Sequence, residues 1–192
     1  MAQESLNQAP ALIAIGGSAG SLHVLMQLLP MWQLSYPVTL VIVLHRKNDY
    51  DSSLTELLAM KSSWPVKEAE DKEAILPGTM YIAPSDYHLF IEANQTFSLD
   101  YSEKINYSRP SIDATFETAA IAYGPRLVCI LLSGANTDGT EGLKKVKEHG
   151  GRIIIQDPQS ANVPFMPHHA IENTIPDAVL APGNILPFLQ KL

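Results

Sequence analysis

Three residue types that together can perform nucleophilic catalysis follow apolar runs in this chain: Ser18, His45 and Asp138. A serine hydroxyl is a weak nucleophile near neutral pH and needs a base within hydrogen-bond reach. Histidine suits that task because its unperturbed pKa is about 6.5. A carboxylate can fix the imidazole tautomer and stabilise the charged ring during attack. If the fold brings the three side chains together, they predict a serine hydrolase site.

The residues around Ser18 fit a nucleophile elbow. Five apolar residues at 11–15 predict a strand buried on both faces, the glycines beside Ser18 allow a sharp turn, and a helix follows. The segment at 16–20 reads Gly-Gly-Ser-Ala-Gly and matches the G-x-S-x-G pattern. Free N–H groups at the start of the helix would stabilise an oxyanion there. The backbone of Ala19 is one candidate donor and that of Ala135 is a second.

Each of the three residues also has a structural interpretation. Ser18 could cap the helix that follows it, His45 could be a polar strand end, and Asp138 could cap the helix that carries Leu143. Taken singly, the residues leave both interpretations open, whereas their conjunction at three strand ends favours catalysis. A dinucleotide-binding turn is disfavoured, because the glycine spacing is not G-x-G-x-x-G and no acidic residue ends the second strand. Weaker candidates for the base or its partner are Asp86, His88, Asp113 and Asp157.

The elements expected to position these residues are parallel strands joined by helices. Apolar runs at 38–44 and 127–132 predict two more buried strands. A right-handed strand–helix–strand unit brings the carboxyl ends of its strands to one edge of the sheet, so the polar residues after them would converge there. The other expected elements are helices at 22–29, 53–60, 110–123 and 166–172, a helix through Leu143 to Gly150, a last helix after Gly183, strands near Val66 and at 153–155, and antiparallel hairpin strands at 80–82, 88–91 and 96–99 with a turn at 93–95.

Composition and charge narrow the class of protein. The 192 residues are 46% apolar and 17% charged, which suits one globular domain with a sizeable core. A net charge of −7 without a basic stripe argues against nucleic acid as a partner. The chain shows no export signal and no apolar run of about 18 residues, so membrane insertion is not expected. Cys129 is the only cysteine and is expected to be an inert core thiol in a cytoplasmic protein. We expect neither a cofactor nor a metal ion.

Short segments spread over nearly the whole chain carry a family pattern: 15–20, 43–45, 68–71, 77–84, 109–113, 132–139, 156–158 and 166–167. In this order they resemble the catalytic domain of the chemotaxis protein-glutamate methylesterases, the CheB type. The resemblance implies an α/β fold, a doubly wound domain whose mostly parallel sheet is flanked by helices and carries an added antiparallel hairpin. It also implies a serine hydrolase that removes methyl groups from glutamate γ-esters on the cytoplasmic helices of chemoreceptors. Some members also deamidate receptor glutamines.

Carried over by position, the resemblance assigns the nucleophile to Ser18, the base to His45 and the acid to Asp138. It also makes Arg109 and Met166 candidates for a substrate-side loop. Many members read Arg-His-Arg-Pro-Ser where this chain has a segment from Tyr107 to Ser111, so the histidine of that motif is replaced by Ser108. We expect this departure to affect a substrate-side loop rather than the triad.

Family members commonly carry a receiver domain in front of the catalytic domain, whereas only ten residues precede the first strand here. We therefore expect residues 1–192 to be a single CheB-type catalytic domain, with 1–10 as a short N-terminal extension and without a receiver domain. The expected partners are the methylated receptor helices, together with a receiver domain or a sensor kinase acting in trans. Two other functions stay open: a non-catalytic interaction module of a sensory complex, and a hydrolase of small esters.

Overall fold

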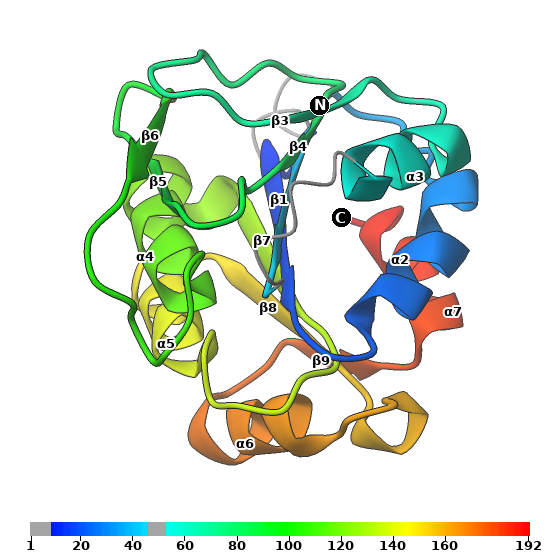
Figure 1. The fold of residues 1–192 in the computed structure, drawn as a ribbon. Helices are drawn as coiled ribbons and strands as arrows, with labels where there is room; N and C mark the ends of the chain where they lie inside the picture. Colours follow the sequence, from blue (N-terminus) through cyan, green and yellow to red (C-terminus); the bar gives the residue numbers. More distant parts are fainter. Residues whose placement is uncertain (1–8, 46–52) are drawn as a thin grey trace.

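The computed structural model describes residues 9–45 and 53–192 and is built around one parallel β-sheet (Figure 1). Its seven strands have the order β3-β4-β2-β1-β7-β8-β9, and every neighbouring pair runs parallel. The strands that come early in the chain (β2, β4 and β3) lie on one side of β1, and the later strands (β7, β8 and β9) lie on its other side. The topological switch point, where such sheets place their sites, therefore lies between β1 and β7. The strands are β1 (Leu12–Gly17), β2 (Thr39–Leu44), β3 (Val66–Glu68), β4 (Met80–Ile82), β7 (Leu127–Leu131), β8 (Arg152–Gln156) and β9 (Ala178–Leu180).

Helices cover both faces of the sheet, which makes the domain doubly wound. In Figure 1, α4 and α5 lie on one side of the strands, α2, α3 and α7 lie on the other, and α6 lies below them. Two hydrophobic clusters fill the space between sheet and helices, one on each face. The helices are α2 (Ser21–Leu28), α3 (Ser53–Lys61), α4 (Ile112–Tyr123), α5 (Thr140–Glu148), α6 (Phe165–Asn173) and α7 (Pro182–Leu189), and the 3₁₀ turns are η1 (Leu29–Met31), η2 (Gly124–Arg126) and η3 (Pro158–Ser160).

The three central strands are the long apolar runs of the sequence. Every residue of β1, β2 and β7 is buried. In β1, Leu12 and Ala14 belong to the cluster beneath α4 and α5, whereas Ile13 and Ile15 belong to the opposite cluster. A parallel strand that is covered on both faces must be apolar at successive positions rather than at alternate ones. The predicted strands at 11–15, 38–44 and 127–132 are therefore confirmed.

The predicted hairpin is right for two of its strands and wrong for the third. β5 (His88–Ile91) and β6 (Phe97–Asp100) form an antiparallel pair, with Gln95 in a left-handed turn between them. Residues 80–82 instead form β4, which pairs in parallel with β2 and β3 in the main sheet. A run of three apolar residues has no periodicity that could separate a core strand from a hairpin strand.

The remaining predicted elements agree with the structure within a few residues. The last helix begins at Pro182, just before Gly183 rather than after it. Strand β9, at the edge of the sheet, is not singled out by the sequence pattern. Cys129 is buried in β7, and burial raises the pKa of its thiol, which fits an unreactive core residue. Across the described ranges, no helix combines the length and the hydropathy needed to span a bilayer.

Candidate active site

Ser18 and His45 are neighbours at the carboxyl edge of the sheet. The hydrogen-bond ladder continues beyond β1, since the Ser18 N–H donates to the carbonyl oxygen of Ser133 (2.9 Å) and the His45 N–H donates to that of Gly17 (3.1 Å). The register of β1 against β2, extended by one residue, places Ser18 opposite His45 on the same face. Adjacent strands lie about 4.8 Å apart, which sets the backbone spacing of the two residues.

The Ser18 side chain does not cap helix α2, so that structural interpretation is wrong. The residue at the N-cap is Gly20, which has φ +85° and makes no side-chain capping bond. The Ser18 carbonyl oxygen instead accepts hydrogen bonds from the N–H and the hydroxyl of Ser21. Among residues 9–45 and 53–192, the Ser18 hydroxyl has no hydrogen-bond partner, and the residue is partly exposed. No contact within these ranges therefore holds the hydroxyl away from a base or a substrate.

Two backbone amides, on the turns after β1 and β7, are the candidates for binding an oxyanion. The first turn is fixed by the Ser133 hydroxyl, which donates to the Ala19 carbonyl oxygen (2.7 Å). The second is fixed by the Gly134 N–H, which donates to the carbonyl oxygen of Val163 (3.0 Å). Within the described part of the chain, the N–H groups of Ala19 and Ala135 have no acceptor, and both residues are exposed. Their role as oxyanion donors stays a proposal.

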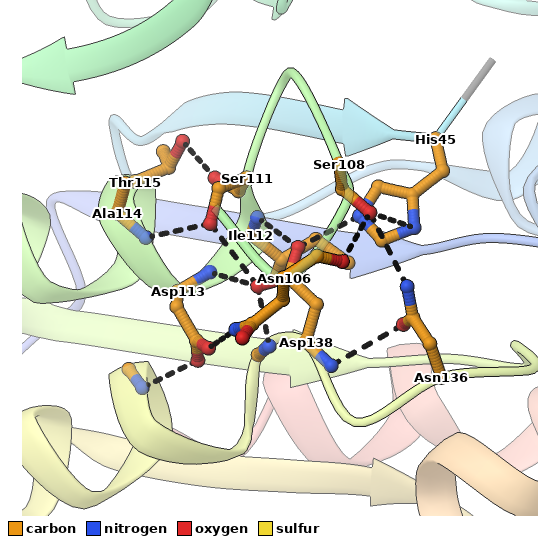
Figure 2. A network of polar contacts seen from close by, with 12 residues as sticks. His45, Asn106, Ser108, Ser111, Ile112, Asp113, Ala114, Thr115, Asn136 and Asp138 are labelled. Carbon is orange, nitrogen blue, oxygen red and sulfur yellow. Dashed lines mark hydrogen bonds and ion pairs between the residues drawn. The ribbon is translucent and has the colours of Figure 1, made fainter. Parts of the chain in front are cut away.

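His45 and Asp138 form an acid–base pair in which the histidine is partly and the aspartate fully buried, as Figure 2 shows for their contact. The ring Nε2 lies 2.7 Å from Oδ2 of Asp138, and the side chains are 12% and 0% exposed, respectively. β1 lies between β2, which ends before His45, and β7, which precedes Asp138. The ring therefore reaches across the end of β1, where Ser18 is the next residue. Because the carboxylate engages Nε2, Nδ1 is the ring nitrogen left to act as a base.

The Asp138 carboxylate binds the start of α4 and does not cap α5. It accepts hydrogen bonds from the N–H groups of Ile112 (2.8 Å) and Asp113 (3.0 Å) and from the Ser111 hydroxyl (3.1 Å). The structural alternative, in which Asp138 caps the helix that carries Leu143, is thus wrong, since α5 begins without a side-chain cap. Burial raises the pKa of Asp138, but the hydrogen bonds from His45 and from the α4 amides outweigh it and lower the pKa below its usual value. The group is therefore a stable anion.

A second carboxyl group, that of Asp113, is buried behind Asp138. Its oxygens accept hydrogen bonds from the Gly142 N–H in α5 (2.7 Å) and from Nδ2 of Asn106 (2.9 Å). Burial, together with the nearby charge of Asp138, raises the pKa of Asp113 to about 7. These contacts join the loop at 101–109 to the first turns of α4 and α5, so Asp113 supports the site without touching the ring.

Ser108 and Asn136 complete the surroundings of the His45 ring, and neither was predicted to lie there. The Ser108 hydroxyl lies 3.5 Å from Nδ1 of His45, and Nδ2 of Asn136 donates to it (3.2 Å). The Asn136 Oδ1 in turn accepts from the Asp138 N–H (3.2 Å). Asn136 belongs to a segment that carries the family resemblance, and Ser108 directly precedes another. That location was the only signal in the sequence, because no pattern of residue types brings 108 and 136 to residue 45.

The two substrate-loop candidates, Arg109 and Met166, contact loop segments of the protein itself. Arg109 is 11% exposed, and its guanidinium donates to the carbonyl oxygens of Tyr101 (3.2 Å) and Ser102 (2.6 Å) and stacks on the Tyr101 ring. Met166 is fully buried and packs against Gly134, to whose carbonyl oxygen its own N–H donates (2.9 Å). Direct contact of either side chain with a substrate stays a prediction.

The weaker candidates have structural partners. Both ring nitrogens of the buried His88 are engaged, one with the Glu103 carbonyl oxygen (3.0 Å) and the other with the Ser111 N–H (3.2 Å). Asp86 forms an ion pair with Arg109 (3.7 Å), and Asp157 caps the 3₁₀ turn η3. No group of three His, Cys, Asp or Glu side chains that could hold a metal ion occurs in the described ranges.

Together, fold and site define a class of protein: a doubly wound α/β domain with a serine and a part-buried histidine–aspartate pair at the switch point of its sheet. The chain belongs to the CheB methylesterase family, whose family model matches residues 13–189. A relative from Leptospira interrogans is 44% identical over 180 residues, which cover 94% of this chain and 93% of that protein.

Two further comparisons involve Thermotoga maritima. Its protein-glutamate methylesterase/protein-glutamine glutaminase is 38% identical over 172 residues, which cover 88% of this chain and 50% of that protein. The crystal structure of the Thermotoga maritima CheB methylesterase catalytic domain matches this structure with a TM-score of 0.90 and 36% identity. That match covers 95% of this chain and 98% of the solved one. The fold predicted from the sequence is thus that of a CheB catalytic domain.

Proposed function

We propose that this protein is a protein-glutamate methylesterase that hydrolyses glutamate γ-methyl esters on the cytoplasmic helices of chemoreceptors, and that it also deamidates receptor glutamines. The observation that carries the proposal is the 2.7 Å contact between His45 and Asp138 at the sheet edge that displays Ser18. Family membership supports the reaction class, and the names of the relatives support the substrate. The cytoplasm, where these receptor helices lie, is the compartment that the proposal requires.

In the proposed reaction, Ser18 Oγ attacks the ester carbonyl carbon while its proton moves to Nδ1 of His45. Asp138 holds the opposite ring nitrogen and balances the charge of the imidazolium. The Ala19 and Ala135 amides bind the oxyanion. The tetrahedral intermediate collapses, and the methoxy group takes the proton from Nδ1 and leaves as methanol. Water then attacks the acyl-enzyme by the same route and releases glutamate. Positioned bases contribute about 10²–10⁴-fold and a single oxyanion donor about 10²–10³-fold.

The test is methanol release from receptor that carries labelled methyl esters, compared with release from a small glutamate γ-methyl ester. Ser18→Ala should reduce release from receptor to background while the fold stays intact, because the hydroxyl has no partner within the described residues to lose. Ser102→Ala, in an exposed loop, is the matched control. Undiminished release by Ser18→Ala would exclude Ser18 as the nucleophile.

The same assay separates the open alternatives and the proposed partners. A non-catalytic interaction module would release no methanol from either substrate, and a small-ester hydrolase would prefer the small ester. Adding a phosphorylated receiver domain, or a sensor kinase with ATP, tests control in trans: faster release from receptor supports it, and an unchanged rate excludes that partner under the assay conditions.

A further inference from the structure

The Ser108 hydroxyl lies at the one nitrogen of His45 that the acid does not engage. Its oxygen is 3.5 Å from Nδ1, whereas Asp138 takes Nε2 at 2.7 Å (Figure 2). In the neutral ring Nε2 carries the proton that points to the carboxylate, so Nδ1 presents a lone pair. The contact on that side is long for a hydrogen bond in this resting state.

The other partners of Ser108 decide what its oxygen can offer to the ring. A hydroxyl has one proton and two lone pairs. Of the two acceptors within reach of the proton, the carbonyl oxygen of Asn106 (3.3 Å) is nearer than Nδ1 of His45 (3.5 Å), so we assign the proton to Asn106; one lone pair accepts from Nδ2 of Asn136 (3.2 Å). The remaining lone pair faces Nδ1 of His45. It gains nothing from a neutral ring, but it becomes a hydrogen-bond acceptor once Nδ1 is protonated.

Ser108 is held in this place from several directions. Asn136 cannot easily reverse its amide, because its Oδ1 accepts from the Asp138 N–H (3.2 Å). The backbone of Ser108 exchanges two hydrogen bonds with Ile105 across a tight turn (3.2 and 2.8 Å). Asn106, inside that turn, is tied to the Asp113 carboxyl group (2.9 Å). The oxygen is therefore fixed before the reaction and needs no reorganisation when charge develops.

We propose that Ser108, oriented by Asn136, is a positioning residue that accepts a hydrogen bond from the protonated Nδ1 of His45 and so stabilises the imidazolium formed while Ser18 attacks. The inference rests on the proposed function, and it concerns a residue that departs from the motif of the resemblance. The contact is weak in the ground state and strong when the ring is charged, so it acts on turnover rather than on substrate binding.

Ser108→Ala should lower kcat about 10- to 150-fold with KM unchanged, the effect of one lost hydrogen bond to a charged group. The acid limb of the kcat profile should move to lower pH, because the charged ring loses a stabilising partner. The other titratable groups near the ring in the described residues are carboxylates, Asp138 in contact and Asp113 behind it, and neither is altered. Ser108→Thr keeps the hydroxyl and should restore both readouts. Ser102→Ala, in the same loop, should change neither.

If Ser108→Ala raises KM and leaves kcat normal, Ser108 contacts the substrate instead. If Ser108→Ala raises kcat, the Ser108 side chain hinders the reaction. Both results overturn the proposal. The ring of His45 can also be titrated by NMR in the full chain without substrate, which separates this inference from the proposed function. A titration midpoint at lower pH in Ser108→Ala supports the contact even if receptor is not hydrolysed. An unchanged midpoint refutes it, provided that both proteins show the same melting temperature.

Discussion

Replacement of Asp138 by asparagine tests whether one carboxylate serves both catalysis and folding. Oδ2 of Asp138 accepts from Nε2 of His45 (2.7 Å) and from the Ile112 N–H (2.8 Å), while Oδ1 accepts from Ser111 and Asp113 (3.1 and 3.0 Å). An asparagine keeps the bonds from Ser111 and Asp113 only if its oxygen takes the Oδ1 place. Its NH₂ group then faces two donors that previously had an acceptor.

Asp138→Asn should lower both kcat and the free energy of unfolding. The ring of His45 can meet an NH₂ group only by accepting from it, which moves the ring proton to Nδ1 and blocks the base. The corresponding loss in the serine protease triad is about 10⁴-fold, so we expect a fall in kcat of about 10³–10⁴-fold. The Ile112 N–H is left buried without an acceptor, which costs about 1–3 kcal/mol of unfolding free energy.

Methanol release and urea unfolding, measured on the same samples, check both effects. Ser18→Ala is the matched comparison, because it should abolish activity while changing the unfolding free energy by no more than about 0.5 kcal/mol. Activity of Asp138→Asn within about tenfold of the unaltered enzyme would exclude the carboxylate as the partner of the base. Lost activity with unchanged stability would mean that the bonds to α4 do not matter for folding.

Two more substitutions probe the supports of the site. Asp113→Asn should stabilise the protein increasingly as pH rises from about 4 to 7 and by a constant amount above that. The reason is that the pKa of Asp113 is raised from 3.8 to about 7 in the folded state. Ionisation of this carboxyl group as pH rises therefore destabilises the folded protein, whereas asparagine stays neutral. The gain has an upper limit of about 4 kcal/mol, and a pH-independent difference in urea unfolding would contradict it. Gly20→Ala should cost about 1–3 kcal/mol from the backbone alone, because φ is +85°. An added Cβ would also lie 2.7 Å from Oγ of Ser133. Gly183→Ala has open space and serves as the control, so equal melting temperatures for the two alanine variants would refute the argument.

The part of the site that could be predicted from sequence is the part that parallel strands fix. Strands buried on both faces produce long apolar runs, and their carboxyl ends meet at one edge, so Ser18, His45 and Asp138 could be named together. The same reasoning failed for residues 80–82, because three apolar residues do not distinguish a core strand from a hairpin. Strand ends predict which residues converge, but they do not predict which atoms touch.

The contacts that could not be predicted join segments far apart in the chain. The sequence left open that Asp138 caps α5, its neighbour in the chain, whereas its carboxylate binds the start of α4. This arrangement depends on Gly16 in β1, where a Cβ would lie 2.4 Å from Ile112 and would push the helix away. The contact of Ser108 with His45 likewise depends on a tight turn and on the Asn136 amide. Neither has a periodic or local sequence pattern.

The distribution of hydrogen bonds within the site follows from what each group must do. The acid is fully buried, and every donor around it favours the charged form. The base is fixed by that acid on Nε2, and its other ring nitrogen has only the long contact with the Ser108 hydroxyl (3.5 Å). The Ser18 hydroxyl and the Ala19 and Ala135 amides, by contrast, have no partner within the described ranges. A nucleophile or oxyanion donor already engaged by protein would first have to break that bond, at a net cost of about 0.5–1.5 kcal/mol for each group. Within the described residues, the fold therefore concentrates its interactions on His45 and Asp138 and leaves the Ser18 hydroxyl and the two amides without partners, which is the arrangement that an ester carbonyl requires.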